Sequence, residues 1–364
     1  MKIGILTFHR SHNYGALLQA IALRHVLIEL GHEVSYVDYY PEYEIRLYEL
    51  YDKTTLHQKK SFKKKLFFIL RTILKGDLLW RWLRIKKFER FRNKYTEPFF
   101  QPIDTKYDTI IYGSDQLWRK HPHINEYDPV YFGKNNFKTN RHISYAVSLS
   151  HLPETENDKR IFNYLVGFQD QISVREMQTK EYLEDNGFSK VSICVDPTLL
   201  IDAKEWDNII PSHRLIEKKY ILIFDLQGDK SVNIFRHEYL ESFAKRNNCK
   251  LVFLSDEARR CPTKYNRQTA SPDEFLNLIR YAELVITSSF HATMFAILYH
   301  KQFYNAQTWG AIRSKSILSQ LGLIDRMLSP EDTISNNDVL IDYSLMDEKL
   351  KSLKKSSVEY LMNL

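Results

Sequence analysis

The chain has 364 residues, 43% of them hydrophobic and 27% charged, which is long and apolar enough for two domains of ordinary size. Gly and Pro number only 11 each, whereas Tyr (23) and Phe (21) are abundant, which excludes a disordered or low-complexity chain. The net charge of +7 does not describe the whole fold, because residues 59–94 hold fourteen Lys and Arg against two acids, a local excess of +12 that leaves −5 elsewhere.

Strands and helices alternate along the first half of the chain. Apolar periodicity predicts strands at 2–8, 33–39, 109–112, 142–148, 171–175 and 191–195, and helices at 14–30, 158–169 and 179–186. Such alternation is typical of a mostly parallel, doubly wound sheet. We therefore expect an N-terminal Rossmann-like domain over residues 1–205.

The basic segment interrupts this domain at about residues 57–97, where basic residues alternate with aromatic and aliphatic residues at helical spacing. Gly76-Asp77 predicts a break between two helices. Basic and aromatic faces suit an anionic membrane surface, where each Lys or Arg contributes about 1 kcal/mol, and they would allow docking onto a lipid-linked substrate. The alternative is a helical hairpin whose apolar stripe packs on its own domain. Nucleic-acid binding is the weakest interpretation, because no recognised motif accompanies the charge, and we expect no nucleic-acid partner.

The second half repeats the alternation. Strands are predicted at 219–226, 250–254 and 284–286, and helices at 232–247, 271–281 and 293–298. They indicate a second Rossmann-like domain over 206–335, followed by a helical tail over 336–364. Two such domains bind ligands in a cleft between the carboxyl ends of their strands.

One group of polar residues follows the strand at 284–286. Ser288, Ser289 and His291 lead from this strand into an apolar helix, so the free N–H groups of the helix start would face an anion. His291 is a candidate proton donor, and the competing interpretation is a histidine that only caps the helix.

Other polar residues follow strands of the first domain. In Asn13-Tyr14-Gly15, Asn13 can cap a helix and Gly15 lets a ligand approach the backbone, but without G-x-G-x-x-G the turn does not indicate NAD binding. Asp115 is a candidate general base or a helix cap. Arg175 offers a bidentate fork to phosphate or carboxylate, or it forms a structural pair with Glu176 or Asp196.

The three cysteines, Cys194, Cys249 and Cys261, are odd in number and lack C-x-x-C spacing, so they predict neither a disulfide framework nor a zinc site. The apolar run at the N-terminus is too short for a signal peptide, and no segment reaches the roughly 18 to 20 apolar residues that span a bilayer. We expect a cytoplasmic protein.

The motifs together resemble the polysaccharide pyruvyl transferase family. The resemblance rests on residues 13–20, 112–118, 172–176, 195–200 and 286–293, on Glu274-Phe275, and on Arg313 with the following Ile317-Leu318 and Leu321-Gly322-Leu323. These motifs occur in the family's order and span nearly the whole chain.

The resemblance implies a GT-B-like fold of two facing Rossmann-like domains, and transfer of the enolpyruvyl-derived group of phosphoenolpyruvate to a sugar. The acceptor would be a surface polysaccharide or its lipid-linked precursor, held by the N-terminal domain, and the product a cyclic pyruvate ketal. The C-terminal domain would hold the donor anion. Phosphoenolpyruvate is a substrate, and no cofactor or metal is expected.

The resemblance also implies roles for single residues. His291 would act as general acid or bind the departing phosphate, and Asp115 would act as general base. Arg175 and Arg313 would neutralise the donor's phosphate and carboxylate. Binding contacts would come from Ser288, Ser289, Asn13, Tyr14 and Gly15. The chain departs from the family pattern at Ala292, where glycine is usual, so a methyl group stands near the expected donor position.

Two other functions fit the same sequence features. One is a GT-B-like glycosyltransferase of exopolysaccharide or capsule biosynthesis that uses a nucleotide sugar. The other is a non-catalytic partner of a polysaccharide assembly complex, held at the inner face of the cell membrane by residues 59–94.

Overall fold

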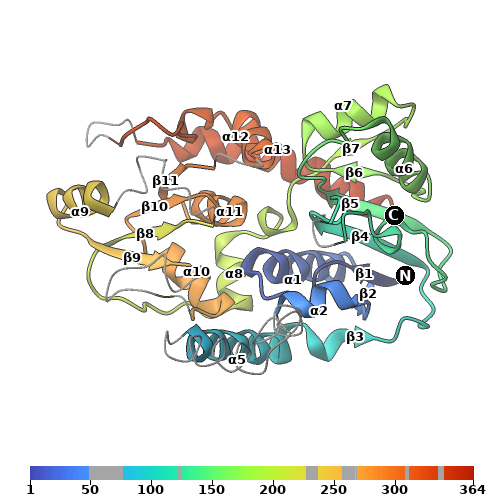
Figure 1. Cartoon of the computed structure of the whole chain (residues 1–364), viewed down its shortest axis with the longest axis horizontal. Helices are drawn as coiled ribbons and strands as arrows, with labels where there is room; N and C mark the ends of the chain where they lie inside the picture. The colour runs from blue at the N-terminus through green and yellow to red at the C-terminus, as the bar shows by residue number, and fades with distance from the viewer. Residues whose placement is uncertain are drawn as a thin grey trace, which may run out of the picture.

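Two parallel sheets form the framework of the computed structural model, which describes residues 1–48, 77–121, 124–226, 237–255, 267, 269–307, 311–334 and 340–364 (Figure 1). The first sheet has the order β3-β2-β1-β4-β5-β6-β7 and the second has the order β11-β10-β8-β9. All paired strands within these two sheets run parallel, so their carboxyl ends share one edge of each sheet. The predicted α/β class with two doubly wound units is confirmed.

The first sheet contains β1 (Lys2–Leu6), β2 (Glu33–Val37), β3 (Phe100–Gln101), β4 (Thr109–Asp115), β5 (His142–Val147), β6 (Ser173–Val174) and β7 (Ser192–Ile193). Its helices are α1 (Tyr14–Glu29), α2 (Glu42–Leu47), α5 (Asp77–Tyr95), α6 (Glu156–Val166) and α7 (Met177–Asp185), and short 3-10 turns occur at η1 (Glu97–Phe99), η2 (Pro129–Phe132) and η3 (Pro197–Leu199). β4 is buried along its whole length, as expected for a central strand covered on both faces.

The second sheet contains β8 (Tyr220–Phe224), β9 (Lys250–Leu254), β10 (Leu284–Thr287) and β11 (Gln302–Asn305). Its helices are α8 (Ala203–Ile209), α9 (His237–Arg246), α10 (Pro272–Arg280), α11 (Phe290–Leu298) and α12 (Ile312–Leu321), followed by η6 (Ile324–Arg326) and α13 (Tyr343–Met362). Of the helix predicted at 232–247, residues 232–236 lie outside the described residues.

Two elements near the strand ends differ from the predicted bounds. β4 continues three residues beyond the predicted end at 112, because Gly113 and Asp115 still pair with Tyr145 and Val147 of β5. α11 begins at Phe290, three residues before the predicted start at 293, because Ser289 is its N-cap and accepts a hydrogen bond from the Ala292 N–H. His291 therefore lies in the first turn of a helix, and Asp115 lies at the end of a strand.

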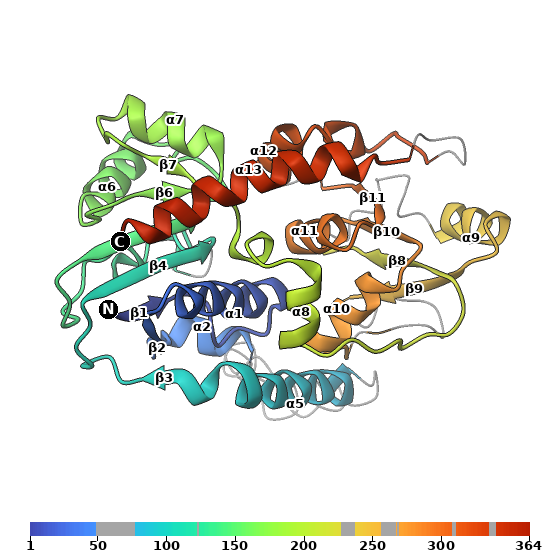
Figure 2. The same cartoon turned by 180° about the vertical axis from the view of Figure 1, so that it is seen from behind.

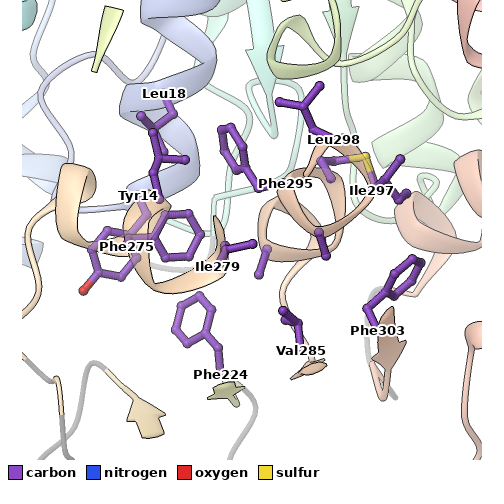
Figure 3. Packing of buried hydrophobic residues seen from close by; sticks show 14 of the residues in the cluster. Tyr14, Leu18, Phe224, Phe275, Ile279, Val285, Phe295, Ile297, Leu298 and Phe303 are labelled. Carbon is purple, nitrogen blue, oxygen red and sulfur yellow. The ribbon is translucent and has the colours of Figure 1, made fainter. Parts of the chain in front are cut away.

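An apolar core joins α1 of the first domain to α10, α11 and the strands of the second sheet (Figure 3). Tyr14 of α1 stacks on Phe275 of α10 with ring centroids 4.7 Å apart, and Phe275 meets Phe295 of α11 edge to face. α13 then crosses from the second sheet back to the first, where the Tyr360 hydroxyl donates to the Ser144 carbonyl at 2.9 Å (Figure 2). The two domains are thus joined through helices that cover both sheets.

The described part of the basic insertion, α5, packs on both domains at its C-terminal half. Phe88 and Phe91 are buried in the shared core, and Lys87 forms an ion pair with Glu274 of α10 at 2.7 Å. Arg84 and Arg92 donate to backbone carbonyls of the turn between β1 and α1. This half fits the hairpin alternative, whereas the first turn of α5 exposes large apolar side chains. Residues 59–76 lie outside the described residues, and so does Gly76 of the predicted break at Gly76-Asp77. Asp77 is described and begins α5.

No helix in the described ranges combines the length and the apolar character that a membrane span requires.

Candidate functional site

Asp196, which caps η3 just after β7, contacts four side chains, three of which come from distant parts of the chain. Its Oδ2 accepts a hydrogen bond from Arg175 Nη1 at 2.5 Å and another from the Ser114 hydroxyl at 3.3 Å. The same oxygen lies 3.6 Å from Nε2 of His291, which comes from the second domain. Thr198 donates to Oδ1 at 2.8 Å. One carboxylate therefore links the two domains at the strand ends.

The neighbouring side chains set the pKa of Asp196. Burial raises the pKa of Asp196, but the His291 and Arg175 cations and the Thr198 hydrogen bond lower it further, so its pKa lies well below the usual range. Asp196 is thus a carboxylate at neutral pH, and a charged imidazole at His291 would face an opposite charge.

Arg175 is only 5% exposed and lies among three carboxylates. Besides Asp196, its guanidinium lies 3.3 Å from Glu176 and 3.7 Å from Asp115. Burial lowers the pKa of Arg175 and the carboxylates raise it, with a net increase. The structural pair that the sequence offered as an alternative is present with both predicted partners. Nη2 is nevertheless buried without a hydrogen bond, so one donor remains for a ligand.

Arg313 of α12 faces the same region from the second domain. Its guanidinium carbon lies 5.6 Å from the ring centroid of Phe290, and that of Arg175 lies 4.5 Å from the same ring. Within the described ranges, Arg313 has no hydrogen bond or ion pair, and its Nε is buried without an acceptor. Burial and the Arg175 charge lower the pKa of Arg313 to about 10, which still leaves a cation at neutral pH. The charges of Asp115 and Glu176 offset these effects only in part, and a cation without a direct ion pair favours an anionic ligand.

The imidazole of His291 lies between Asp196 and α1. Its Nε2 is buried and makes no hydrogen bond, while Nδ1 faces Gly15 so closely that a Cβ atom at Gly15 would lie 1.9 Å from it. The space at Gly15, which the sequence suggested for a ligand, is occupied by His291. Glycine is therefore needed here for the contact between the domains.

Asp115 completes the group at the end of β4. It is 7% exposed, and its Oδ1 accepts from the Gln116 N–H at 2.8 Å and lies 3.7 Å from Arg175 Nη2. The two predicted catalytic residues, Asp115 and His291, thus both lie near Arg175. A small cavity beside Arg175 is lined by Arg175, Asp196, Phe290, Met294, Arg313 and neighbouring residues, but not by Asp115 or His291.

The other predicted binding residues make contacts within the protein. Asn13 is the exposed N-cap of α1 and accepts from the Ala16 N–H, and the Tyr14 hydroxyl donates to the Ala270 carbonyl. Ser288 donates to Asp225 and accepts from the Leu226 N–H, and Ser289 caps α11. These contacts fix the starts of α1 and α11.

Sequence reasoning missed the central place of Asp196, which it treated only as one partner of Arg175. The signal was present, since Asp196-Pro197-Thr198 follows a short strand just as Asp115 and Arg175 do. Ala292, the departure from the family pattern, is fully buried among apolar residues of the shared core.

The described residues contain no cluster of three or more His, Cys, Asp or Glu side chains suited to a metal ion. Cys194 and Cys249 are free thiols, and burial raises the pKa of Cys194 to about 12. Cys261 lies outside the described residues.

A model of the polysaccharide pyruvyl transferase family matches residues 13–305, most of the chain. The chain belongs to this family. The resemblance inferred from the motifs is confirmed, and with it a place among transferases of polysaccharide biosynthesis. The match includes Gly15, Asp115, Arg175 and His291 but ends before Arg313, whose assignment rests on its position beside Phe290.

Solved structures similar to this pyruvyl transferase family member include sugar-nucleotide epimerases and a glycosyltransferase. The UDP-GlcNAc 2-epimerase from Methanocaldococcus jannaschii has a TM-score of 0.50 at 11% identity, covering 96% of this chain and 92% of the epimerase. The UDP-GlcNAc 2-epimerase from Neisseria meningitidis has a TM-score of 0.44 at 10% identity, with 100% and 94% covered. The glycosyltransferase SnogD from Streptomyces nogalater has a TM-score of 0.43 at 11% identity, with 99% and 94% covered. No curated protein sequence matches significantly. The likeness to the M. jannaschii enzyme, over nearly the whole of both chains, confirms the predicted GT-B-like fold.

Proposed function

We propose that the chain transfers the enolpyruvyl-derived group of phosphoenolpyruvate to a sugar of a surface polysaccharide or its lipid-linked precursor, forming a pyruvate ketal. The observation that carries the proposal is a set of buried nitrogen atoms without hydrogen-bond partners. Arg175 Nη2 and Arg313 Nε belong to residues that line one cavity, and His291 Nε2 lies 3.6 Å from Asp196, which lines it too. Buried donors are rarely left unsatisfied, so they favour an anionic ligand. Phosphoenolpyruvate carries a phosphate and a carboxylate that suit two guanidinium groups.

The reaction requires one proton to be added to the donor and two to be removed from the acceptor. Protonation of the methylene carbon produces an oxocarbenium-like centre at the carbon that carries the phosphate. One sugar hydroxyl attacks this carbon and loses its proton. A second hydroxyl then displaces the phosphate and loses its proton, which closes the ketal ring and releases inorganic phosphate.

The arrangement supports a separate role for each residue. His291, whose Nε2 lies 3.6 Å from the Asp196 carboxylate, would donate the proton. Arg175 and Arg313 would bind phosphate and carboxylate. Asp115 would accept the proton of the first hydroxyl from its position beside Arg175.

The first test uses the surface polysaccharide of the native host. Deleting the gene should remove pyruvate ketals detected by mass spectrometry, and the wild-type gene should restore them. His291→Ala should fail to restore them, because a positioned proton donor is worth roughly 10²- to 10⁴-fold in rate. His300→Ala is the matched control, since His300 is half-exposed and pairs with Asp347 away from the cavity. Unchanged ketals after deletion would contradict the proposal and favour the nucleotide-sugar alternative.

We further propose that the start of α5 contacts an anionic membrane, which would bring the site to lipid-linked acceptors. Leu79, Trp80 and Trp82 are 59%, 46% and 46% exposed, and Arg81 lies exposed among them. Apolar and basic groups together suit a lipid interface.

Co-sedimentation with phosphatidylserine vesicles measures this contact. Binding should fall in Trp80→Ser/Trp82→Ser and at high salt, because charge attraction is screened. Leu345→Ser, on the exposed surface of α13, should bind as the wild type does. Equal binding by all three proteins would contradict the membrane contact.

A further inference from the structure

Gln19 is fully buried in α1 and uses every hydrogen-bonding group of its amide. Its Nε2 donates to Thr7 Oγ1 at 2.7 Å and to the Ala16 carbonyl at 2.9 Å. Its Oε1 accepts from the backbone N–H of Ser114 at 3.0 Å. The side chain therefore connects α1, the end of β1 and the end of β4.

The contacts of Gln19 and Thr7 hold both backbone groups of Ser114. Thr7 Oγ1, which accepts from Gln19, donates to the Ser114 carbonyl at 3.3 Å. The Ser114 hydroxyl accepts from Arg175, and its single proton is shared between the Ala146 carbonyl at 2.9 Å and Asp196 Oδ2 at 3.3 Å. Ser114 is thus held between the Gln19–Thr7 pair and the Asp196–Arg175 pair.

The residue after Ser114 is the candidate base. Asp115 has a φ of 74°, in the left-handed region that is disfavoured for residues other than glycine. Such a backbone persists where its surroundings hold it. The hydrogen bonds that Gln19 and Thr7 make with Ser114 help to fix the backbone just before Asp115. They therefore help to set the position of the Asp115 carboxylate.

Gln19 also stands on the helix face that contacts His291. Gly15 and Gln19 are separated by four residues, so they lie one above the other on the same face of α1. Gly15 contacts the His291 imidazole, and Gln19 binds Ser114. One face of α1 therefore contacts both His291, the candidate acid, and Ser114, the residue before the candidate base.

We propose that Gln19 is a positioning residue of the transfer reaction, acting through Ser114 to hold the Asp115 carboxylate beside Arg175. The expected change in kinetics rests on the proposed function. The expected change in local structure rests on the hydrogen bonds alone.

Gln19→Met tests the inference, because methionine preserves most of the volume and removes all three hydrogen bonds. Thr7→Val, a smaller change, removes only the hydroxyl of the pair. Asn277→Leu is the matched control, since Asn277 is another fully buried helical amide with three partners, far from Asp115 in the sequence and in the second domain. Phosphate release from phosphoenolpyruvate is measured with polysaccharide purified from the deletion strain as acceptor.

In Gln19→Met, kcat should fall on the order of 10²-fold, the cost of a small misplacement of a reacting group, while KM for phosphoenolpyruvate stays near the wild-type value. In Thr7→Val, kcat should also fall, but by a smaller factor. The limb of the pH–rate profile that reports the base should move in Gln19→Met, which a merely structural role would not cause. Asn277→Leu should lose stability but keep both kcat and the pH profile.

Hydrogen–deuterium exchange at residues 113–116 gives a readout that does not depend on turnover. Exchange should quicken there in Gln19→Met and remain as in the wild type in Asn277→Leu. A wild-type protein that releases no phosphate would contradict the proposed function. Unchanged exchange at 113–116, or an active Gln19→Met with wild-type kcat, would overturn the positioning role itself.

Discussion

Asp196→Asn is expected to abolish most turnover and to destabilise the protein. Removing the charge leaves Arg175 with a weaker partner and His291 without an opposite charge, although the shape of the side chain is nearly unchanged. Breaking a buried ion pair by removing one partner costs about 3–5 kcal/mol in the free energy of unfolding. The rate should fall within the roughly 10²- to 10⁴-fold range expected when a proton donor loses its support.

Urea unfolding and phosphate release measure the two effects. Glu205→Gln is the matched control, because Glu205 of α8 also pairs with a histidine, His25, at 2.6 Å, but at a half-exposed position. That variant should lose little stability and no activity. Wild-type kcat in Asp196→Asn would show that the charge at this position does not support the reaction.

The pH dependence of stability should change in a defined direction. The pKa of Asp196 is depressed by folding, so its stabilising contribution is present above the unfolded-state value of about 3.9 and is lost as pH falls through the lower folded value. The wild type should therefore lose stability in acid more steeply than Asp196→Asn. Parallel curves for the two proteins below about pH 4 would contradict this assignment.

Gly15→Ala is the second change with a large expected effect. The new methyl carbon would lie 1.9 Å from His291 Nδ1, and the imidazole is confined on its other side by Asp196. Either the imidazole leaves Asp196 or α1 and α11 separate, and both outcomes disrupt the site. We expect kcat to fall on the order of 10²-fold and stability to fall by about 1–3 kcal/mol from overpacking.

A double-mutant cycle separates this clash from a general effect of the methyl group. Gly15→Ala/His291→Ala should recover stability relative to Gly15→Ala, because the shorter side chain at residue 291 removes the clash. Gly167→Ala is the control, since its added carbon would meet only the Tyr164 and Asn163 carbonyls, at 3.3 and 3.7 Å. Additive effects of the two substitutions would contradict the close contact between Gly15 and His291.

Local rules predicted much of the fold correctly. Buried strands such as β1 and β9 follow from their apolar runs, α10 from its apolar periodicity and capping box, and α1 from its continuous apolar sequence and its Asn13 cap. All these signals act between near neighbours in the sequence. Errors arose where long-range pairing decided the end of an element, as at β4, whose last residues are held by β5. β11 and α12 were not predicted as separate elements.

The sequence by itself determined that polar residues follow the strands, that positive charge gathers in residues 59–94, and which family the motifs indicate. Only the tertiary structure decided which of these residues meet. Arg175, Asp196 and His291 are far apart in the chain, and Gly15 faces an imidazole from the other domain. The physical reason is that capping and periodicity act over a few residues, whereas a buried carboxylate is stabilised by whichever cations the packed core brings to it.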